Sequence, residues 1–316
     1  MPNQEFPFRS ILVAIDFSEH AGAALGRAVA LAEKTGAAVK AVHVVTGVEW
    51  AVAGTSFAGH WRVPPNEIRK AEKRLRQQAE ERLTAWLAPF AKQNPELKSE
   101  VLVGIAFVEI IRAVRKEKHD LVLAGTRGLS GVGRMLVGST AERLVRKCPC
   151  PVWIVKPQHE WPLRSILAPV DLTAMSGQVL EIAGALGRVA RCALTVLHVF
   201  NFPSEQIATL PEAIVGLDVR SQRRALRQTA ANQLSDFVKR HVPERTKVAQ
   251  QLGAGSPWQA IVRAADRLDA GLIVMGSVGR TGIPGFLIGN TGEKVLRHCD
   301  RSILAVKPEG FVSPVK

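Results

Sequence analysis

Short apolar runs followed by helical patterns recur along the chain and predict parallel strands joined by helices. One such run ends in Asp16 and another ends in Asp171. Neither run alternates with polar residues, which is typical of strands buried on both faces of a parallel sheet. Small-residue stretches with helical spacing follow at 21–34 and 176–190, and a second apolar run comes after each. A β-α-β unit is therefore predicted at the start of each half.

The remainder of each half continues the alternation of strands and helices. Long amphipathic helices are predicted at about 66–93 and 212–241, and shorter ones at 108–118 and 257–268. This regular pattern indicates an α/β fold with two tandem doubly wound, mainly parallel five-stranded sheets and right-handed crossovers. We expect the strand order 3-2-1-4-5 in each. The expected strands are 10–16, 38–45, 98–103, 121–126 and 152–156, then 165–171, 193–200, 246–252, 272–277 and 303–307.

The length and the prolines predict two domains of similar size. A chain of 316 residues is long enough for about two ordinary domains. Pro157 and Pro162 interrupt regular structure near the middle, which predicts domains at 1–157 and 158–316. The proline-marked tail from Pro308 is too short for another element and is expected along the surface.

The formal charge of +14 admits two kinds of partner, nucleic acid or an anionic small ligand. The basic residues of 69–82 and 220–227 have helical spacing, which indicates solvated helix faces. Aromatic residues do not interleave with them and tyrosine is absent, so a stacking platform for single strands is poorly supported. The composition therefore favours a small anion over nucleic acid.

The chain shows no sign of export, a membrane span or a disulfide framework. Its first residues lack a basic stretch followed by an apolar one, and no apolar run reaches the roughly 18 residues of a membrane helix. Four unevenly spaced cysteines suit a reducing compartment, and we expect a cytoplasmic protein. The pair Cys148 and Cys150 is interpreted as packing, with a metal or redox half-site as the alternative.

A glycine-punctuated loop occurs twice, at equivalent places in the two halves. Each copy reads G-x-x-G, nine residues, and then Gly-Ser or Gly-Asn, between an apolar run and an amphipathic segment. Glycine lets backbone amides approach an anion, and a helix N-terminus favours phosphate through its free donors and dipole. The loops therefore predict phosphate binding. Arg127, Arg134 and Arg280 lie in them and would screen phosphate charge.

An alternative explanation needs no ligand for part of each loop. Ser139 and Asn290 each have a glutamate three residues later, which is the sequence signature of a helix capping box. Such a cap stabilises a helix by roughly 1 kcal/mol. It explains the serine and the asparagine, but not three glycines at fixed separations.

Polar residues at the ends of the first and second strands are further candidates. Asp16 and Asp171 would accept hydrogen bonds from an adenine amino group or a ribose hydroxyl, or would instead cap the following helices. His43 and His198 occupy matching places on the second strands. Because no carboxylate, histidine and cysteine cluster lies beside them in the sequence, structural histidines are favoured over metal ligands.

The loop spacing G-2x-G-9x-G-[S/T], with an aspartate closing the first strand, resembles the ATP-binding universal stress proteins. The likeness covers nearly the whole chain, and the second half looks like the tandem E-type bacterial members. It implies an adenine nucleotide alpha hydrolase-like fold and ATP as ligand, with or without Mg²⁺. The binding residues that it implies are Asp16, Val44, Gly125, Arg127, Gly128, Gly138, Ser139 and Thr140, then Asp171, Val199, Gly276, Gly279, Gly289, Asn290 and Thr291.

The resemblance also implies partners and a mode of action. Family members pair through their last strands, which here means internal pairing of 152–155 with 303–306 or a homodimer. Occupancy by nucleotide is expected to control conformation or partner binding in a stress response. The chain has no P-loop, dinucleotide or nucleophile-elbow motif, so no fast enzyme is expected. A slow ATPase and a carrier of a lipid-like ligand or protein partner stay as alternatives, and Asn290 departs from the ATP-type pattern.

Overall fold

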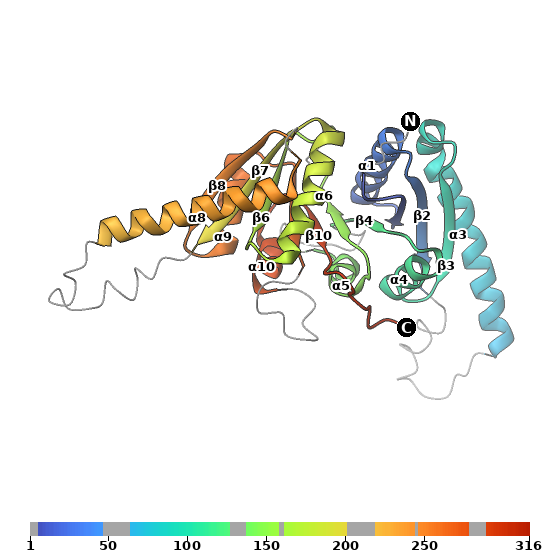
Figure 1. Ribbon diagram of the computed structural model, residues 1–316. Helices are drawn as coiled ribbons and strands as arrows, with labels where there is room; N and C mark the ends of the chain where they lie inside the picture. Colours follow the sequence, from blue (N-terminus) through green and yellow to red (C-terminus); the bar gives the residue numbers. More distant parts are fainter. Residues whose placement is uncertain are drawn as a thin grey trace. The chain divides into compact units, whose positions relative to one another are not determined.

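The computed structural model describes residues 6–46, 64–126, 137–157, 161–200, 219–243, 246–277 and 289–316. The chain forms two compact units (Figure 1). The first unit comprises Met1–Trp161 together with Gly310–Lys316, and the second comprises Pro162–Glu309.

The first unit contains five parallel strands in the predicted order 3-2-1-4-5. In the register of β1, Ile15 lies opposite His43 of β2, and Ala14 lies opposite Ala124 of β4. The carboxyl ends of these three strands therefore meet at one edge. The strands are β1 (Ser10–Ile15), β2 (Ala38–Val45), β3 (Lys98–Val103), β4 (Leu121–Gly125) and β5 (Val152–Val155).

The second unit repeats this arrangement, with β6 at the centre between β7 and β9, β8 beyond β7, and β10 beyond β9. All of these pairs are parallel, so the predicted α/β class and strand order are confirmed for both units. The strands are β6 (Ser165–Val170), β7 (Ala193–Phe200), β8 (Val248–Ala254), β9 (Leu272–Gly276) and β10 (Ser302–Val306).

Helices alternate with the strands as the apolar pattern predicts. Their ends differ from the predicted ones by a few residues, and 212–218 lie outside the described residues. The first unit has α1 (Glu19–Thr35), α3 (Pro65–Gln93), α4 (Ala106–Glu117) and α5 (Ser139–Lys147). The second has α6 (Ala174–Ala190), α8 (Val219–His241), α9 (Pro257–Arg267) and α10 (Asn290–His298).

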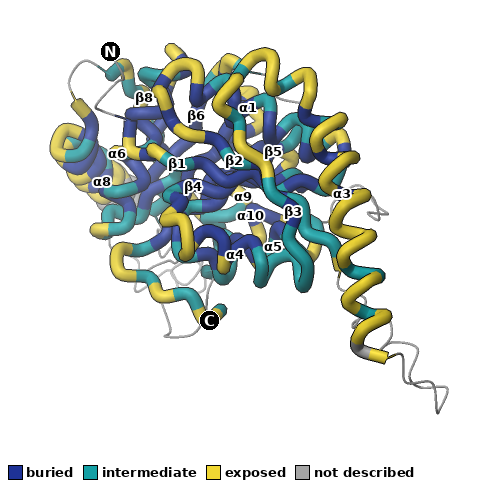
Figure 2. Tube along the Cα trace, turned by 90° about the vertical axis from the view of Figure 1, so that its right-hand side faces the viewer, coloured by how far each residue is buried: buried dark blue, intermediate teal, exposed yellow. Residues whose placement is uncertain are grey.

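The central strands are buried on both faces, which explains their unbroken apolar runs. Ile11, Leu12 and Val13 of β1 have no exposed surface, although they point alternately to opposite faces. Figure 2 shows the central strands buried, whereas α3 carries a long exposed face. Burial of this kind contributes about 1.5–3 kcal/mol per large apolar side chain.

The end of the described chain lies along α4 of the first unit. Nε of Arg112 donates to the carbonyl oxygen of Lys316 at 3.1 Å, and Arg115 donates to that of Val315 at 2.6 Å. Val312 is 84% exposed, whereas these two hydrogen bonds hold the last two residues against α4.

Candidate functional site

A cavity lies in the first unit at the carboxyl ends of β1, β2 and β4, where the strand order reverses. Its described walls enclose about 180 Å³, with Ala106 and Ile110 of α4 on one side and the start of α5 on another. Ligands of doubly wound sheets bind at this place. The structure brings six predicted site residues together around it, and Arg127 and Gly128 lie outside the described residues. The six are Asp16, Val44, Gly125, Gly138, Ser139 and Thr140.

The start of α5 provides backbone donors at this cavity. The carbonyl of Gly138 accepts the first helical hydrogen bond, from the amide of Glu142 at 2.9 Å. The amides of Ser139, Thr140 and Ala141 precede that bond, so the helix itself provides no acceptor for them. All three residues line the cavity. Together with the positive end of the helix dipole, these amides favour an anion such as phosphate.

The alternative in which Ser139 and Asn290 cap their helices is wrong. The residue before α5 is Gly138 and the residue before α10 is Gly289, so the serine and the asparagine are the first residues inside the helices. Neither helix has a side-chain cap hydrogen bond within the described residues. The amide of Gly138 donates a hydrogen bond to the carbonyl of Thr126 at 2.7 Å, and this bond fixes the position of the residue before α5.

Gly125 is required by packing as well as being part of the predicted loop. A Cβ atom there would lie 2.7 Å from Cβ of His20 and 3.0 Å from the backbone nitrogen of Ala21. Both residues belong to the first turn of α1. The close approach of α1 to the end of β4 therefore requires glycine at this position.

Asp16 supports the start of α1 and still has an oxygen for a ligand. Its Oδ1 accepts hydrogen bonds from the amide of Ser18 at 3.0 Å and from its hydroxyl at 2.5 Å. Ser18 is the N-cap of α1, and its Oγ accepts from the amide of Ala21. Asp16 therefore holds the cap and is not the cap itself. Within the described residues its Oδ2 accepts no hydrogen bond, which leaves that atom for a donor in the cavity.

Phe17 has a strained backbone conformation in the turn after β1. Its φ of 63° lies in the left-handed region, which costs a non-glycine residue about 1–3 kcal/mol. The Phe17 ring centroid lies 4.4 Å from that of His43 and 6.0 Å from that of Trp86, and the Arg82 guanidinium lies 4.0 Å above the ring. These contacts offset the strain and fix the turn that presents Asp16.

His43 has a structural role and also forms a wall of the cavity. Its Nδ1 lies 2.8 Å from the carbonyl oxygen of Ile15, which can only accept, so Nδ1 carries the hydrogen. His198 makes the same contact with Val170 at 2.9 Å in the second unit. The structural role favoured from the sequence accounts for both contacts, but the sequence analysis missed that the His43 ring lines the cavity.

Thr126, Ala106 and Ile110 are further lining residues that the sequence analysis missed. Thr126 directly follows Gly125 in the motif, so its position in the sequence could have predicted that it lines the cavity. The two α4 residues lie four apart on one helix face, and Ile110 is buried, so helical periodicity was a weaker signal for them.

In the second unit the equivalent aspartate, Asp171, accepts hydrogen bonds from nearby residues of the chain. Oδ1 of Asp171 accepts hydrogen bonds from the Thr173 hydroxyl at 2.6 Å, the Ser176 hydroxyl at 2.7 Å and the Thr173 amide at 3.3 Å. Leu172 repeats the left-handed turn with a φ of 62°. Ser176 takes the place of Ala21 and adds a hydroxyl that the first unit lacks.

The other predicted residues of the second unit lie at positions equivalent to those of the first. Gly276 ends β9, Gly289 precedes α10, and Asn290 and Thr291 begin that helix. The amide of Gly289 donates to the carbonyl of Ser277 at 2.8 Å, as the matching amide does in the first unit. Val199 is next to last in β7, and Gly279 lies outside the described residues.

The opposite, amino-terminal edge of the first sheet carries an ion-pair cluster. Nζ of Lys40 lies 2.6 Å from Glu100 and 2.5 Å from Glu117. Burial lowers the pKa of Lys40 but its two glutamate partners raise it more, and the hydrogen bond to Lys40 lowers the pKa of Glu117. His119 is buried beside them, with Nδ1 2.7 Å from the Ser10 hydroxyl, and burial lowers its pKa.

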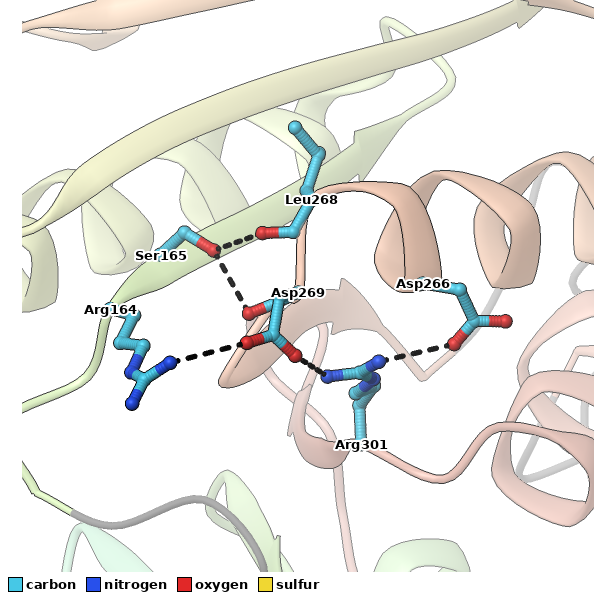
Figure 3. Close-up of polar contacts among 6 residues, drawn as sticks. All are labelled: Arg164, Ser165, Asp266, Leu268, Asp269 and Arg301. Carbon is cyan, nitrogen blue, oxygen red and sulfur yellow. Dashed lines mark hydrogen bonds and ion pairs between the residues drawn. The ribbon is translucent and has the colours of Figure 1, made fainter.

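The corresponding edge of the second sheet is held by Asp269 (Figure 3). Its carboxylate lies between Arg301, at 2.5 Å, and Arg164, at 3.7 Å. Burial lowers the pKa of Arg301, but the hydrogen bonds and charges of Asp269 and Asp266 together raise it more. The hydroxyl of Ser165 donates to the carbonyl of Leu268 at 3.1 Å. Both edges therefore stabilise strand starts, away from the cavity.

The described residues offer neither a metal cluster nor a membrane helix. No group of three histidine, cysteine, aspartate or glutamate side chains suited to a metal occurs among them. Their helices also lack the combination of length and hydropathy that crossing a membrane requires. Sγ of Cys148 and Sγ of Cys150 lie 3.6 Å apart and buried, within hydrogen-bond distance and without a disulfide between them.

Comparison with known proteins accounts for the duplicated fold. A model of the universal stress protein family matches residues 7–156 and, a second time, residues 162–307. The chain belongs to the universal stress protein family. With two such domains and full-length likeness to universal stress protein E, it is a tandem member of the E type.

Relatives share this organisation over their whole length. The chain is 27% identical to universal stress protein E of Photorhabdus laumondii, over 98% of each chain. It is 26% identical to universal stress protein E of Escherichia coli K12, over 98% of this chain and 97% of that one. A putative universal stress protein of Pseudomonas aeruginosa superposes with a TM-score of 0.66 at 23% identity, covering 97% and 96% of the two chains. Each of these relatives therefore matches both halves of the chain.

Proposed function

We propose that the first unit binds ATP and that its occupancy regulates a stress response through conformation or partner binding. The observation that carries this proposal is that hydrogen-bond donors and an acceptor line one cavity. Its lining includes Ser139, Thr140 and Ala141, whose amides have no acceptor within α5, and Asp16, whose Oδ2 accepts no hydrogen bond within the described residues. A ligand that fits has an anionic end and an end that donates hydrogen bonds.

An adenine nucleotide has both of these ends. Its phosphates would accept from the amides at the start of α5, and its amino group or ribose hydroxyls would donate to Asp16. Val44 of β2 also lines the cavity and would offer its backbone to the base. The described walls enclose about 180 Å³, which is less than the roughly 300 Å³ at which small-ligand pockets begin.

A regulatory role fits the residues better than rapid catalysis does. Nδ1 of His43 donates a hydrogen bond to the carbonyl of Ile15, and Oδ1 of Asp16 accepts one from the amide of Ser18. Neither residue is placed as a general base beside the start of α5 by any contact in the described chain. We expect turnover far below the roughly 1–100 per second of phosphoryl-transfer enzymes.

The second unit is a weaker candidate for ATP. Three hydrogen bonds, from Thr173 and from Ser176 of α6, occupy Oδ1 of Asp171, and Asn290 brings a longer side chain to the start of α10. We propose that this loop serves mainly as architecture or for a protein partner. Occupancy of about one nucleotide per chain is therefore expected.

Nucleotide content and affinity test the proposal. We would release and identify the bound nucleotide from the purified full chain, then titrate ATP with and without Mg²⁺ by calorimetry. Gly138→Val should abolish binding, because a branched side chain would stand among the phosphate donors. The φ of −59° at Gly138 suits any residue, so the variant should fold.

The matched control is Gly289→Val, at the same position of the second unit, where φ is −68°. It should leave the affinity of the first site unchanged. Absence of ATP binding by the wild-type chain would overturn the proposal in favour of a carrier of another ligand. Full affinity in folded Gly138→Val would show that the start of α5 is not the phosphate site.

A further inference from the structure

His20 contacts the glycine loop where the loop leaves the sheet. It is the second residue of α1, and its Nδ1 lies 2.7 Å from Oγ1 of Thr126. Thr126 directly follows β4, is 3% exposed and lines the cavity. The imidazole thus fixes the position of a hydroxyl beside the proposed phosphate site.

Thr126 is also tied to the other end of the loop. Its carbonyl oxygen accepts a hydrogen bond from the amide of Gly138 at 2.7 Å, just before α5 begins. A side chain that fixes Thr126 therefore restrains the carbonyl that holds Gly138. Through this carbonyl, His20 is linked to the residue from which the phosphate donors begin.

The second unit keeps the backbone closure but lacks the side-chain contact. Met175 is the second residue of α6, where His20 stands in α1, and Ser277 takes the place of Thr126. The hydroxyl of Ser277 is buried and has no hydrogen-bond partner among the described residues. The amide of Gly289 still donates to the carbonyl of Ser277. Within the described residues, the first unit therefore has a side-chain hydrogen bond at this place that the second lacks.

We propose that His20 is a positioning residue for the nucleotide phosphates, acting through the hydroxyl and carbonyl of Thr126. The expected effect of His20 on ATP affinity rests on the proposed ATP site. The restraint that His20 places on Thr126 does not require a ligand. A hydroxyl rotates freely unless a partner fixes it, and fixing it in advance reduces the entropy that binding must remove.

Four variants of the full chain test this proposal through ATP affinity. His20→Met installs the residue of the second unit and should weaken binding about 3- to 10-fold, as loss of one hydrogen bond predicts. His20→Asn should keep near wild-type affinity, because an atom at the δ position of the asparagine amide can form the hydrogen bond to Thr126 that Nδ1 of histidine forms. Thr126→Val should weaken binding by a similar factor. The double variant His20→Met with Thr126→Val should be no weaker than Thr126→Val alone.

Amide hydrogen exchange in the nucleotide-free protein separates the two proposals. The Gly138 amide should exchange faster in His20→Met than in the wild type, and at the wild-type rate in His20→Asn. Unchanged exchange, or losses of affinity that add up in the double variant, would overturn the positioning role. If no form binds ATP while exchange responds as expected, the proposed ligand fails but the restraint by His20 stands.

The second unit provides the reciprocal experiment. Met175→His should give the buried hydroxyl of Ser277 a partner and slow exchange at Gly289, with no effect at Gly138. Unchanged exchange at Gly289 would show that this position does not control the loop, which would contradict the proposal.

Discussion

The two units share one backbone plan but use the end of their first strand differently. In the first unit, Oδ1 of Asp16 accepts hydrogen bonds from the amide and the hydroxyl of Ser18, the N-cap of α1, and within the described residues its Oδ2 accepts none. In the second, Oδ1 of Asp171 accepts hydrogen bonds from Thr173, before α6, and from Ser176, in the first turn of α6. The same aspartate at the same strand end therefore engages a different set of neighbours in each unit.

The difference shows that a repeated motif does not make a repeated site. Both glycine-led helices begin with amides that have no acceptor within the helix, and equivalent backbone hydrogen bonds precede both helices. Among the described residues, side chains around this shared backbone frame separate the units. The following changes test each of these differences, starting with the largest expected effect.

Gly125→Val should destabilise the first unit most. Its Cβ would meet the backbone and Cβ of His20 within 3.0 Å, so α1 would have to move, at a cost of about 3 kcal/mol or more. Urea unfolding of the full chain should show an earlier transition for this unit. Gly26→Ala is the control, because its Cβ has only ordinary contact at 3.8 Å and should not destabilise. Equal stability of the two variants would contradict the packing explanation.

Asparagine substitutions of the two aspartates should separate stability from binding. Asp171→Asn weakens charge-assisted hydrogen bonds and should cost about 1–3 kcal/mol of unfolding free energy, with no effect on the first site. Asp16→Asn should cost less stability, because only Ser18 depends on it, but should reduce ATP affinity. Calorimetry and urea unfolding of both variants measure the two effects. A larger stability loss for Asp16→Asn would reverse the assigned roles.

Exchanging the first helical residues should alter affinity with little change in stability. Ser139→Asn places the longer side chain of the second unit at the proposed phosphate site and should weaken ATP binding about tenfold, equivalent to roughly 1.4 kcal/mol. Asn290→Ser is the reciprocal change and should not weaken it. If Ser139→Asn binds as the wild type does, this residue does not distinguish the units.

Mild acid should destabilise the first unit slightly more than the second. Burial lowers the pKa of His119, so between its folded value and about 6.5 the unfolded chain binds more protons. Stability should therefore fall as the pH drops from about 7 through this range. The lowered pKa of Glu117 adds a further loss at lower pH, below its unfolded value.

His119→Gln is the test of this acid sensitivity, measured as thermal midpoints at pH 7.5 and 5.5. The variant should lose less stability than the wild type between the two pH values. Ala270 occupies the matching place before β9, so the second unit has no such imidazole there. An unchanged pH dependence would show that His119 does not contribute.

Local pattern was sufficient to predict the elements and which strand ends meet. Unbroken apolar runs identified the buried strands, and alternation with helices predicted two sheets of order 3-2-1-4-5. In such sheets the ends of β1 and β4 must meet. The gathering of Asp16, Gly125 and Ser139 around one cavity is consistent with this expectation, whereas the identity of the ligand stays a prediction.

Contacts between distant segments decided what each residue does there. Gly125 is glycine because α1 packs on it, and His20 reaches Thr126 across more than a hundred residues of sequence. Gly138 precedes α5 because its amide is held by Thr126. Periodicity and motif spacing report on neighbours along the chain and on faces of an element. They do not report which side chains meet when α1 packs against β4, and those meetings distinguish the two units.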